Sequence, residues 1–109
     1  MTNRQSIIGE FEQLVLLAIL QLDDEAYGPN ISEELETKAG RRVSRGALYS
    51  SLDRLQQKGL LRWKIESATS VRGGHPKRCF EVTRPGIAAL REYRKALTNL
   101  WAGLEEVIG

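Results

Sequence analysis

The sequence is poor in the residues that most catalytic and metal centres need. Its 109 residues include one cysteine, Cys79, and one histidine, His75. A single cysteine cannot form an internal disulfide or a multi-cysteine zinc site. With one histidine beside it, the chain also lacks the usual inventory for a catalytic triad. We therefore expect no enzyme activity, no metal site and no cofactor.

Long hydrophobic runs are also missing. The longest, residues 14–20, is seven residues long, whereas a helix that spans a bilayer needs about 20 apolar residues. Near the N-terminus one base, Arg4, is followed by acids, a pattern not typical of a targeting peptide. We therefore expect a cytoplasmic protein. Its length and its hydrophobic fraction of 41% predict a single domain with one compact core.

Bases are scarce at the start of the chain, and acids are scarce in its middle. Residues 1–37 contain one base and eight acids, a net charge of −7, and their carboxylates are expected on solvated faces. Residues 38–84 contain twelve bases and three acids, a net charge of +9, whereas residues 85–109 are balanced. This asymmetry points to a polyanion as partner of the middle third.

Hydrophobic spacing in the first sixty residues is that of helices. Apolar residues three and four apart predict helices over about residues 9–22, 29–38 and 44–58. The first is nearly apolar all round in its second half, so it should be buried on more than one side. Pro29 suits a first helical position, while Ser44 and Gly59 have the chemistry of an N-cap and a C′ residue.

The apolar period then changes from about 3.6 to 2. Residues 61–66 and 77–83 alternate apolar and polar side chains, which predicts two strands joined by a flexible loop that contains Gly73-Gly74. Thr83 as N-cap and an early Pro85 begin a last helix that should reach Ile108. Its 3-4-3-4 seam predicts helix–helix dimerisation through Ile87, Leu90, Arg94, Leu97, Trp101, Leu104 and Ile108.

Three helices followed by a two-stranded hairpin is the element order of a winged helix-turn-helix. We predict a mainly α fold with a small β-hairpin (α+β), with a DNA-binding domain at residues 1–83 and a C-terminal dimerisation helix at residues 84–109. A recognition helix needs short or polar side chains near its N-terminus to enter a major groove about 12 Å wide. The predicted contacts to double-stranded DNA are Lys38, Arg41, Arg42, Ser44, Arg45, Tyr49, Ser50, Arg72, His75, Lys77 and Arg78.

Roles within this set differ. Arg45 and Ser50 are expected to read the edges of DNA bases. The side chains expected to hold phosphates are Lys38, Arg41, Arg42, Lys77 and Arg78. Arg72 and His75, on the loop, reach either neighbouring phosphates or the minor groove. Tyr49 either donates its hydroxyl to a phosphate or packs its ring on the second helix. A glycine inside a helix, such as Gly46, lowers the stability of the helix by about 1 kcal/mol relative to alanine, so its presence there calls for an explanation. Either the backbone approaches DNA closely there, or it packs closely on the second helix.

Three runs of the sequence resemble the PadR-like family of transcriptional regulators. They are AYG at residues 26–28, GALYSSLDRLQQKGLL at 46–61 and GHPKRCFEVTRPG at 74–86. The resemblance covers about residues 8–95, and the short chain with one C-terminal helix is similar to the family's small members. Two residues depart from the pattern: His75 stands where many members have arginine, and Cys79 where an aromatic residue is common.

The resemblance implies a homodimeric repressor of a pseudo-palindromic operator, with dimerisation through the last helix and the first, including Phe11. It also implies that Arg54 lies on the DNA-facing side of the third helix. Because some members bind flat apolar effectors between subunits, Trp101 either buries dimer surface or forms a wall for such an effector. Arg94 would pair with a glutamate or an anionic effector. The alternative, a winged-helix adaptor that binds proteins, has no need of the +9 charge.

Overall fold

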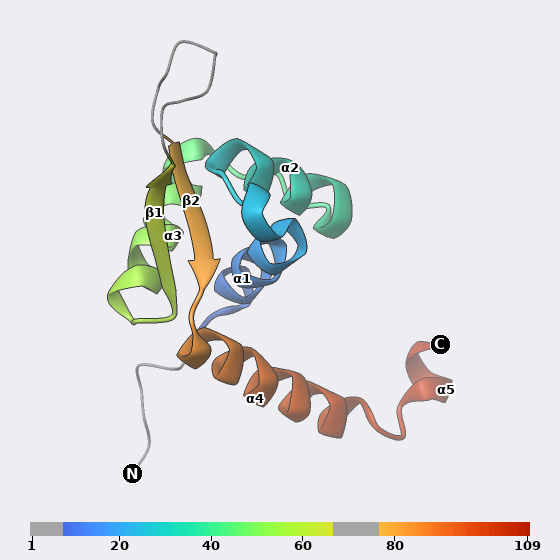
Figure 1. The fold of residues 1–109 in the computed structure, drawn as a ribbon. Helices are drawn as coiled ribbons and strands as arrows, with labels where there is room; N and C mark the ends of the chain where they lie inside the picture. The colour runs from blue at the N-terminus through green and yellow to red at the C-terminus, as the bar shows by residue number, and fades with distance from the viewer. Residues whose placement is uncertain (1–7, 67–76) are drawn as a thin grey trace.

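The protein, described here by a computed structural model over residues 8–66 and 77–109, is mainly helical with one antiparallel hairpin (Figure 1). This confirms the predicted fold class. In chain order the elements are α1 (Glu10–Leu22), the 3₁₀ turn η2 (Asp23–Glu25), α2 (Gly28–Ala39), α3 (Arg45–Gln57), β1 (Leu61–Glu66), β2 (Lys77–Val82), α4 (Arg84–Trp101) and α5 (Glu105–Ile108).

The helices α2 and α3 begin and end at residues whose local chemistry can be recognised in the sequence. Gly40 ends α2 in the left-handed region, with φ 66°, which glycine adopts without a steric penalty. The Ser44 hydroxyl accepts a hydrogen bond from the Ala47 amide at 3.1 Å, so Ser44 is the N-cap of α3 as predicted. Gly59, at φ 79°, turns the chain into β1.

The hairpin is tied to the helices along one edge. β1 and β2 pair in antiparallel register from Leu61 opposite Val82 to Glu66 opposite Lys77. On its other side β2 bonds to the segment before α2, because the Phe80 amide donates to the Ala26 carbonyl at 2.9 Å. The hairpin therefore has a fixed place beside the starts of α2 and α3.

One core joins α1, α2, α3 and the hairpin. Its largest fully buried side chains include Leu16 and Ile19 of α1, Ile31 of α2, Leu52 of α3 and Phe80 of β2. The second half of α1 is not buried all round, however, since Leu17 and Leu20 are 46% and 43% exposed. α1 nevertheless packs against α2, α3 and β2, so the prediction that it is buried on more than one side is confirmed.

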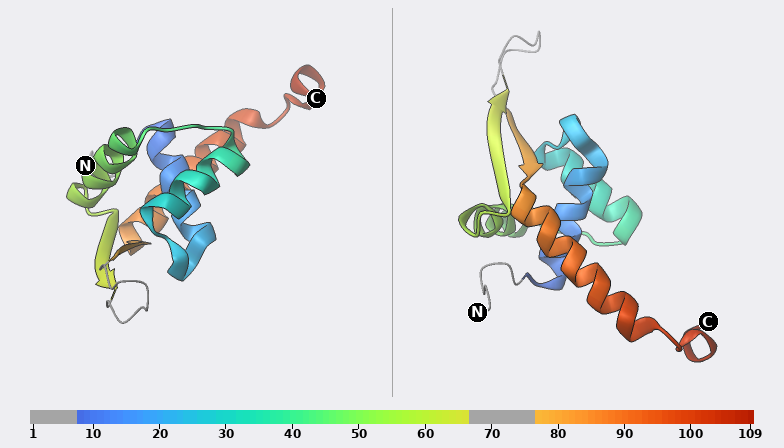
Figure 2. Two further views of the ribbon diagram at one scale, coloured as in Figure 1. Left: turned by 90° about the horizontal axis from the view of Figure 1, so that it is seen from above. Right: turned by 60° about the horizontal axis from the view of Figure 1, so that its bottom comes forward.

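The last helix is shorter than predicted. The helix expected to reach Ile108 ends at Trp101, because Gly103 takes φ 84° and the chain turns before the four-residue α5. Leu104 and Ile108 therefore do not continue the α4 seam, and the single helix expected over residues 84–109 is wrong. The second half of α4 extends beyond α1, α2 and α3 (Figure 2). No helix in the described residues is long and apolar enough to cross a bilayer.

The start of α4 is fixed by Thr83 and Gly86. The Thr83 hydroxyl accepts from the Gly86 amide at 3.2 Å and donates to the Gly59 carbonyl at 2.7 Å. Gly86 is buried, and a Cβ placed on it would overlap the carbonyl oxygen of Leu60. This close approach holds α4 against the turn that links α3 to β1.

We predict that Gly86→Ala lowers the free energy of unfolding by about 1–3 kcal/mol, because the obstructing atom belongs to the backbone and cannot rotate away. Gly46→Ala is the matched control, since a Cβ there meets nothing within 4 Å. Urea unfolding of both variants provides the measurement. Equal stability of Gly86→Ala and the natural protein would show that α4 can shift to accept the methyl group.

Candidate nucleic-acid interface

A hollow of about 610 Å³ lies where the starts of α2, α3 and β2 meet. It is lined by Glu25, Tyr27, Gly28, Pro29, Asn30, Arg45, Tyr49, Lys77 and Arg78. Four predicted DNA contacts, Arg45, Tyr49, Lys77 and Arg78, thus come together from two elements. Sequence patterns could not find the other lining residues, because only the fold brings η2 and the start of α2 beside β2.

Aromatic rings support the three bases of this hollow. The Arg45 guanidinium carbon is 5.7 Å from the Tyr49 ring centre, and the Lys77 ammonium is 5.3 Å from that of Tyr27. Arg78 lies 4.5 Å from the ring centre of Trp63. Within residues 8–66 and 77–109, no carboxylate lies within ion-pair distance of these three bases. A ring face orients a cation without neutralising it, so this edge keeps its positive charge.

The two tyrosines of the hollow are half-buried. Tyr49 packs edge-on to Phe80, with 6.4 Å between ring centres, and a Cβ on Gly28 would overlap its hydroxyl. Its ring therefore packs against the start of α2, while its contact with a phosphate stays a prediction. Burial, and after it nearby negative charge led by Glu66, raises the pKa of Tyr27. The Tyr27 hydroxyl is thus protonated at neutral pH and can donate a hydrogen bond.

The bases that precede α3 have carboxylate partners. Lys38 pairs with Glu34 at 2.8 Å, Arg41 with Glu10 at 2.9 Å and Arg42 with Glu36 at 3.5 Å. None of these three bases lines the hollow. The Arg41 and Arg42 pairs are exposed, and such pairs contribute about 0–1 kcal/mol each, so a phosphate could replace their carboxylates. The Glu34 side chain that pairs with Lys38 is 15% exposed. The phosphate contacts of all three bases remain predictions.

The remaining predicted contacts have different settings. The Ser44 hydroxyl caps α3, and Ser50 is exposed on that helix. Arg54 donates to the Ser51 hydroxyl at 3.1 Å and pairs with Glu12 at 3.5 Å. It therefore already has partners on the side of α3 that faces α1. Arg72 and His75 lie outside the described residues.

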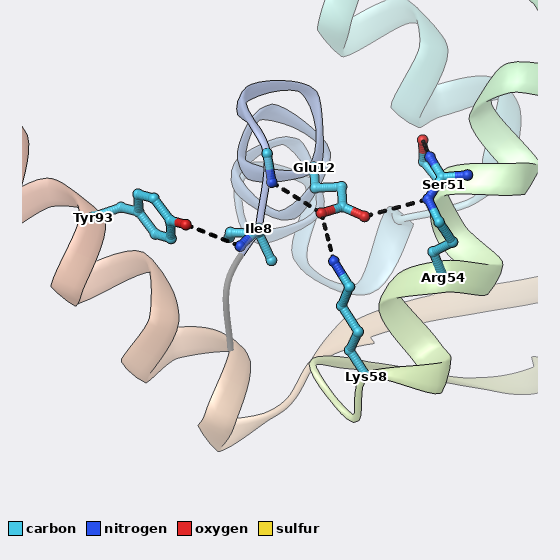
Figure 3. Close-up of polar contacts among 7 residues, drawn as sticks. Ile8, Glu12, Ser51, Arg54, Lys58 and Tyr93 are labelled. Carbon is cyan, nitrogen blue, oxygen red and sulfur yellow. Dashed lines mark hydrogen bonds and ion pairs between the residues drawn. The ribbon is translucent and has the colours of Figure 1, made fainter. Parts of the chain in front are cut away.

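Glu12 corrects the expectation that the early carboxylates lie on solvated faces. It is only 7% exposed and accepts hydrogen bonds from Lys58 Nζ at 2.9 Å and the Gly9 amide at 3.0 Å (Figure 3). Burial alone would raise the pKa of Glu12, but the hydrogen bonds from Lys58, Gly9 and Arg54, together with the charge of Lys58, outweigh it and lower that pKa. Sequence spacing could not reveal this cluster, because Arg54 and Lys58 lie more than forty residues from Glu12 along the chain.

A second feature, an apolar groove of about 570 Å³, runs between α1 and α4. Five predicted dimer residues line it from α4: Ile87, Leu90, Arg94, Leu97 and Trp101. Leu17 and Leu20 face them from α1, and sequence reasoning did not single out these two. Phe11, also predicted for the interface, packs partly buried against the core instead of lining the groove.

Cys79 has no reactive setting. Its buried thiol donates to the Asp24 carbonyl at 3.6 Å, and burial raises the pKa of that thiol. A protonated, buried thiol is a poor nucleophile. In the part of the chain that the structure describes, no three His, Cys, Asp or Glu side chains gather as a metal site.

A helical trio with a two-stranded wing and a basic edge defines a winged helix-turn-helix protein. The profile of the transcriptional regulator PadR-like family matches residues 16–92, and the chain belongs to this family. The family resemblance read from the three sequence runs is thereby confirmed.

Individual relatives agree with this assignment. A transcriptional regulator of Mycobacterium tuberculosis, Rv3488, is 40% identical over 87 residues, which are 80% of this chain and 74% of the relative. A PadR family regulator of Eggerthella lenta has a similar structure, with TM-score 0.66 and 27% identity over 91% of this chain and 86% of the other. The fold is also that of a Clostridium difficile PadR family regulator, with TM-score 0.73 and 20% identity over 91% and 99% of the two chains.

The surroundings of Gly46 bear on the two explanations for a glycine inside α3. Close packing on α2 is wrong, because a Cβ on Gly46 meets nothing within 4 Å, whereas close approach of this backbone to DNA stays a prediction. We predict that Gly46→Ala raises the free energy of unfolding by about 0.5–1 kcal/mol yet weakens DNA binding at least about tenfold. Thermal unfolding and fluorescence anisotropy provide the two values. A gain in stability with unchanged affinity would contradict close approach.

Proposed function

We propose that the protein is a homodimeric transcriptional repressor of the cytoplasm that binds a pseudo-palindromic DNA operator through α3 and the hairpin. The observation that carries the proposal is the hollow in which Arg45, Lys77 and Arg78 keep their charge beside the first turn of the recognition helix. Membership of a family of transcriptional regulators supports the same conclusion.

Each element has a distinct task in this proposal. Arg45 is the first residue of α3, where its long side chain can reach base edges in the major groove, and Ser50 follows five residues further along the same helix. Lys77 and Arg78 hold phosphates from the wing, and the Tyr27 and Tyr49 hydroxyls add hydrogen bonds to the same strand. The amides at the start of α2 favour an anion there as well. Lys38, Arg41 and Arg42 reach further phosphates once they exchange their carboxylate partners.

A second copy of the chain is the proposed occupant of the α1–α4 groove. Leu17, Leu97 and Trp101 are about half exposed there, and a two-fold axis would bury them against the same residues of the partner. The exposed side of α1 that carries Leu17 and Leu20 would then be buried as well. Dimerisation would place two recognition helices about 34 Å apart, one turn of DNA.

The groove also suits a small aromatic or hydrophobic effector. Trp101 gives it an aromatic wall and Arg94 a positive charge at its edge. An effector bound there would alter the angle between subunits and thus the spacing of the recognition helices, which weakens operator binding. Both residues line the groove on α4, so a single ligand could contact them together.

The function is tested by selection of bound sites from random DNA, followed by affinity measurements on the selected site and on scrambled DNA. We predict that Arg45→Ala weakens binding to the selected site by about 1–3 kcal/mol with little change on scrambled DNA. Arg62→Ala is the control, because Arg62 pairs with Glu81 at the end of the hairpin away from its loop. An equal loss on both DNAs, with a shallower salt dependence, would make Arg45 a phosphate contact. Absence of any selected DNA would favour a protein-binding adaptor.

We predict that Leu97→Glu dissociates the dimer, because it places a charge in the middle of the apolar groove. Ala96→Glu is the matched control, since Ala96 is exposed on α4 but does not line the groove. Sedimentation equilibrium gives the mass of each variant. A dimeric Leu97→Glu, or an equal effect of Ala96→Glu, would place the interface elsewhere.

A further inference from the structure

Hydrogen bonds, linked by the backbone between Ile8 and Gly9, connect α4 to α3 through the start of α1 (Figure 3). The Tyr93 hydroxyl of α4 accepts from the Ile8 amide at 3.0 Å. The next amide, that of Gly9, donates to Glu12 Oε1 at 3.0 Å. The same oxygen accepts from Lys58 Nζ at 2.9 Å, and the other oxygen lies 3.5 Å from Arg54 Nε. The path joins the helix that lines the groove to the far end of the recognition helix.

The carboxylate of Glu12 makes this path sensitive to geometry. A buried charge is tolerated only when its partners remain in place, because an unpaired carboxylate in a poorly hydrated site is strongly unfavourable. Glu12 takes one partner from the N-cap of its own helix and two from α3. A shift of α1 relative to α3 would therefore separate a buried charge from at least one partner.

We propose that Glu12 is a positioning residue that fixes α3 against α1 and transmits changes at α4, through Tyr93 and the Ile8–Gly9 backbone, to the recognition helix. The proposal rests on the proposed function, in which α3 binds DNA and α4 forms the dimer. Tyr93 follows Leu90 and precedes Arg94 and Leu97, all three of which line the groove. A molecule or second subunit in that groove thus contacts the same stretch of helix that holds Ile8.

The direction in which one substitution changes the affinity for DNA separates this positioning role from a simple effect of charge. Glu12→Gln keeps the shape of the side chain but removes a negative charge beside Lys58 and Arg54. A purely electrostatic effect would strengthen binding to every DNA, because the protein becomes more positive. Loss of positioning would instead weaken binding to the selected operator alone, since random DNA requires no fixed angle of α3.

We predict that Glu12→Gln weakens binding to the selected operator about fivefold or more, while binding to random DNA is unchanged or stronger. Tyr93→Phe, which removes one oxygen atom and retains the ring, should weaken operator binding in the same direction. The double variant should be no weaker than Glu12→Gln alone, because both act on one path. Loss on both DNAs, a gain on both, or losses that multiply in the double variant would overturn the proposal.

A second measurement needs no DNA. Amide chemical shifts and hydrogen exchange of full-length protein should change over residues 51–58 when Tyr93 is replaced by Phe, but not when the same replacement is made in Glu12→Gln. Changes confined to residues near Ile8, or changes in α3 that persist without the carboxylate, would refute transmission through Glu12. If the natural protein selects no DNA, the proposed function fails, and this measurement still decides whether the path couples α4 to α3.

Discussion

The packing of α3 on α1 is the constraint on which the other features depend. Leu48, Leu52 and Leu55 of α3 are almost completely buried, so the helix can present only its opposite side to a partner. The polar cluster at Glu12 closes one end of this contact. Because α1 also forms one wall of the groove with α4, a single helix supports both α3 and the candidate dimer surface.

The basic side chains that were predicted to contact DNA fall into two groups, according to whether their neighbour is a carboxylate or an aromatic ring. Carboxylates from the acidic first third neutralise Lys38, Arg41 and Arg42, whereas aromatic rings hold Arg45, Lys77 and Arg78. The positive charge of residues 38–84, +9 in total, is therefore not spread evenly over the surface, because three of its basic side chains are paired with carboxylates. A phosphate at a ring-supported base replaces no ion pair, so most of the electrostatic attraction should come from the hollow.

Sequence reasoning succeeded where the cause of a structure is local. Helical and strand periods, and the caps at Ser44 and Thr83, lie within a few residues of the elements that they define. It failed where the cause is distant or ambiguous. The apolar seam continues in register past Gly103, so periodicity alone could not reveal that this glycine turns the chain. The partners of Glu12 and the lining of the hollow are set by tertiary packing, which spacing does not report.

The proposed occupancy of the groove and the proposed path through Glu12 together limit the free energy by which the groove can regulate operator binding. If occupancy of the groove weakens operator binding by way of Tyr93 and Glu12, then operator binding must weaken groove occupancy by the same factor. A path built from three hydrogen bonds and one longer ion pair can transmit no more free energy than the difference in its contacts between two states. Strong regulation would therefore also require the subunit angle to change, with Glu12 ensuring that α3 follows α1 as a rigid unit.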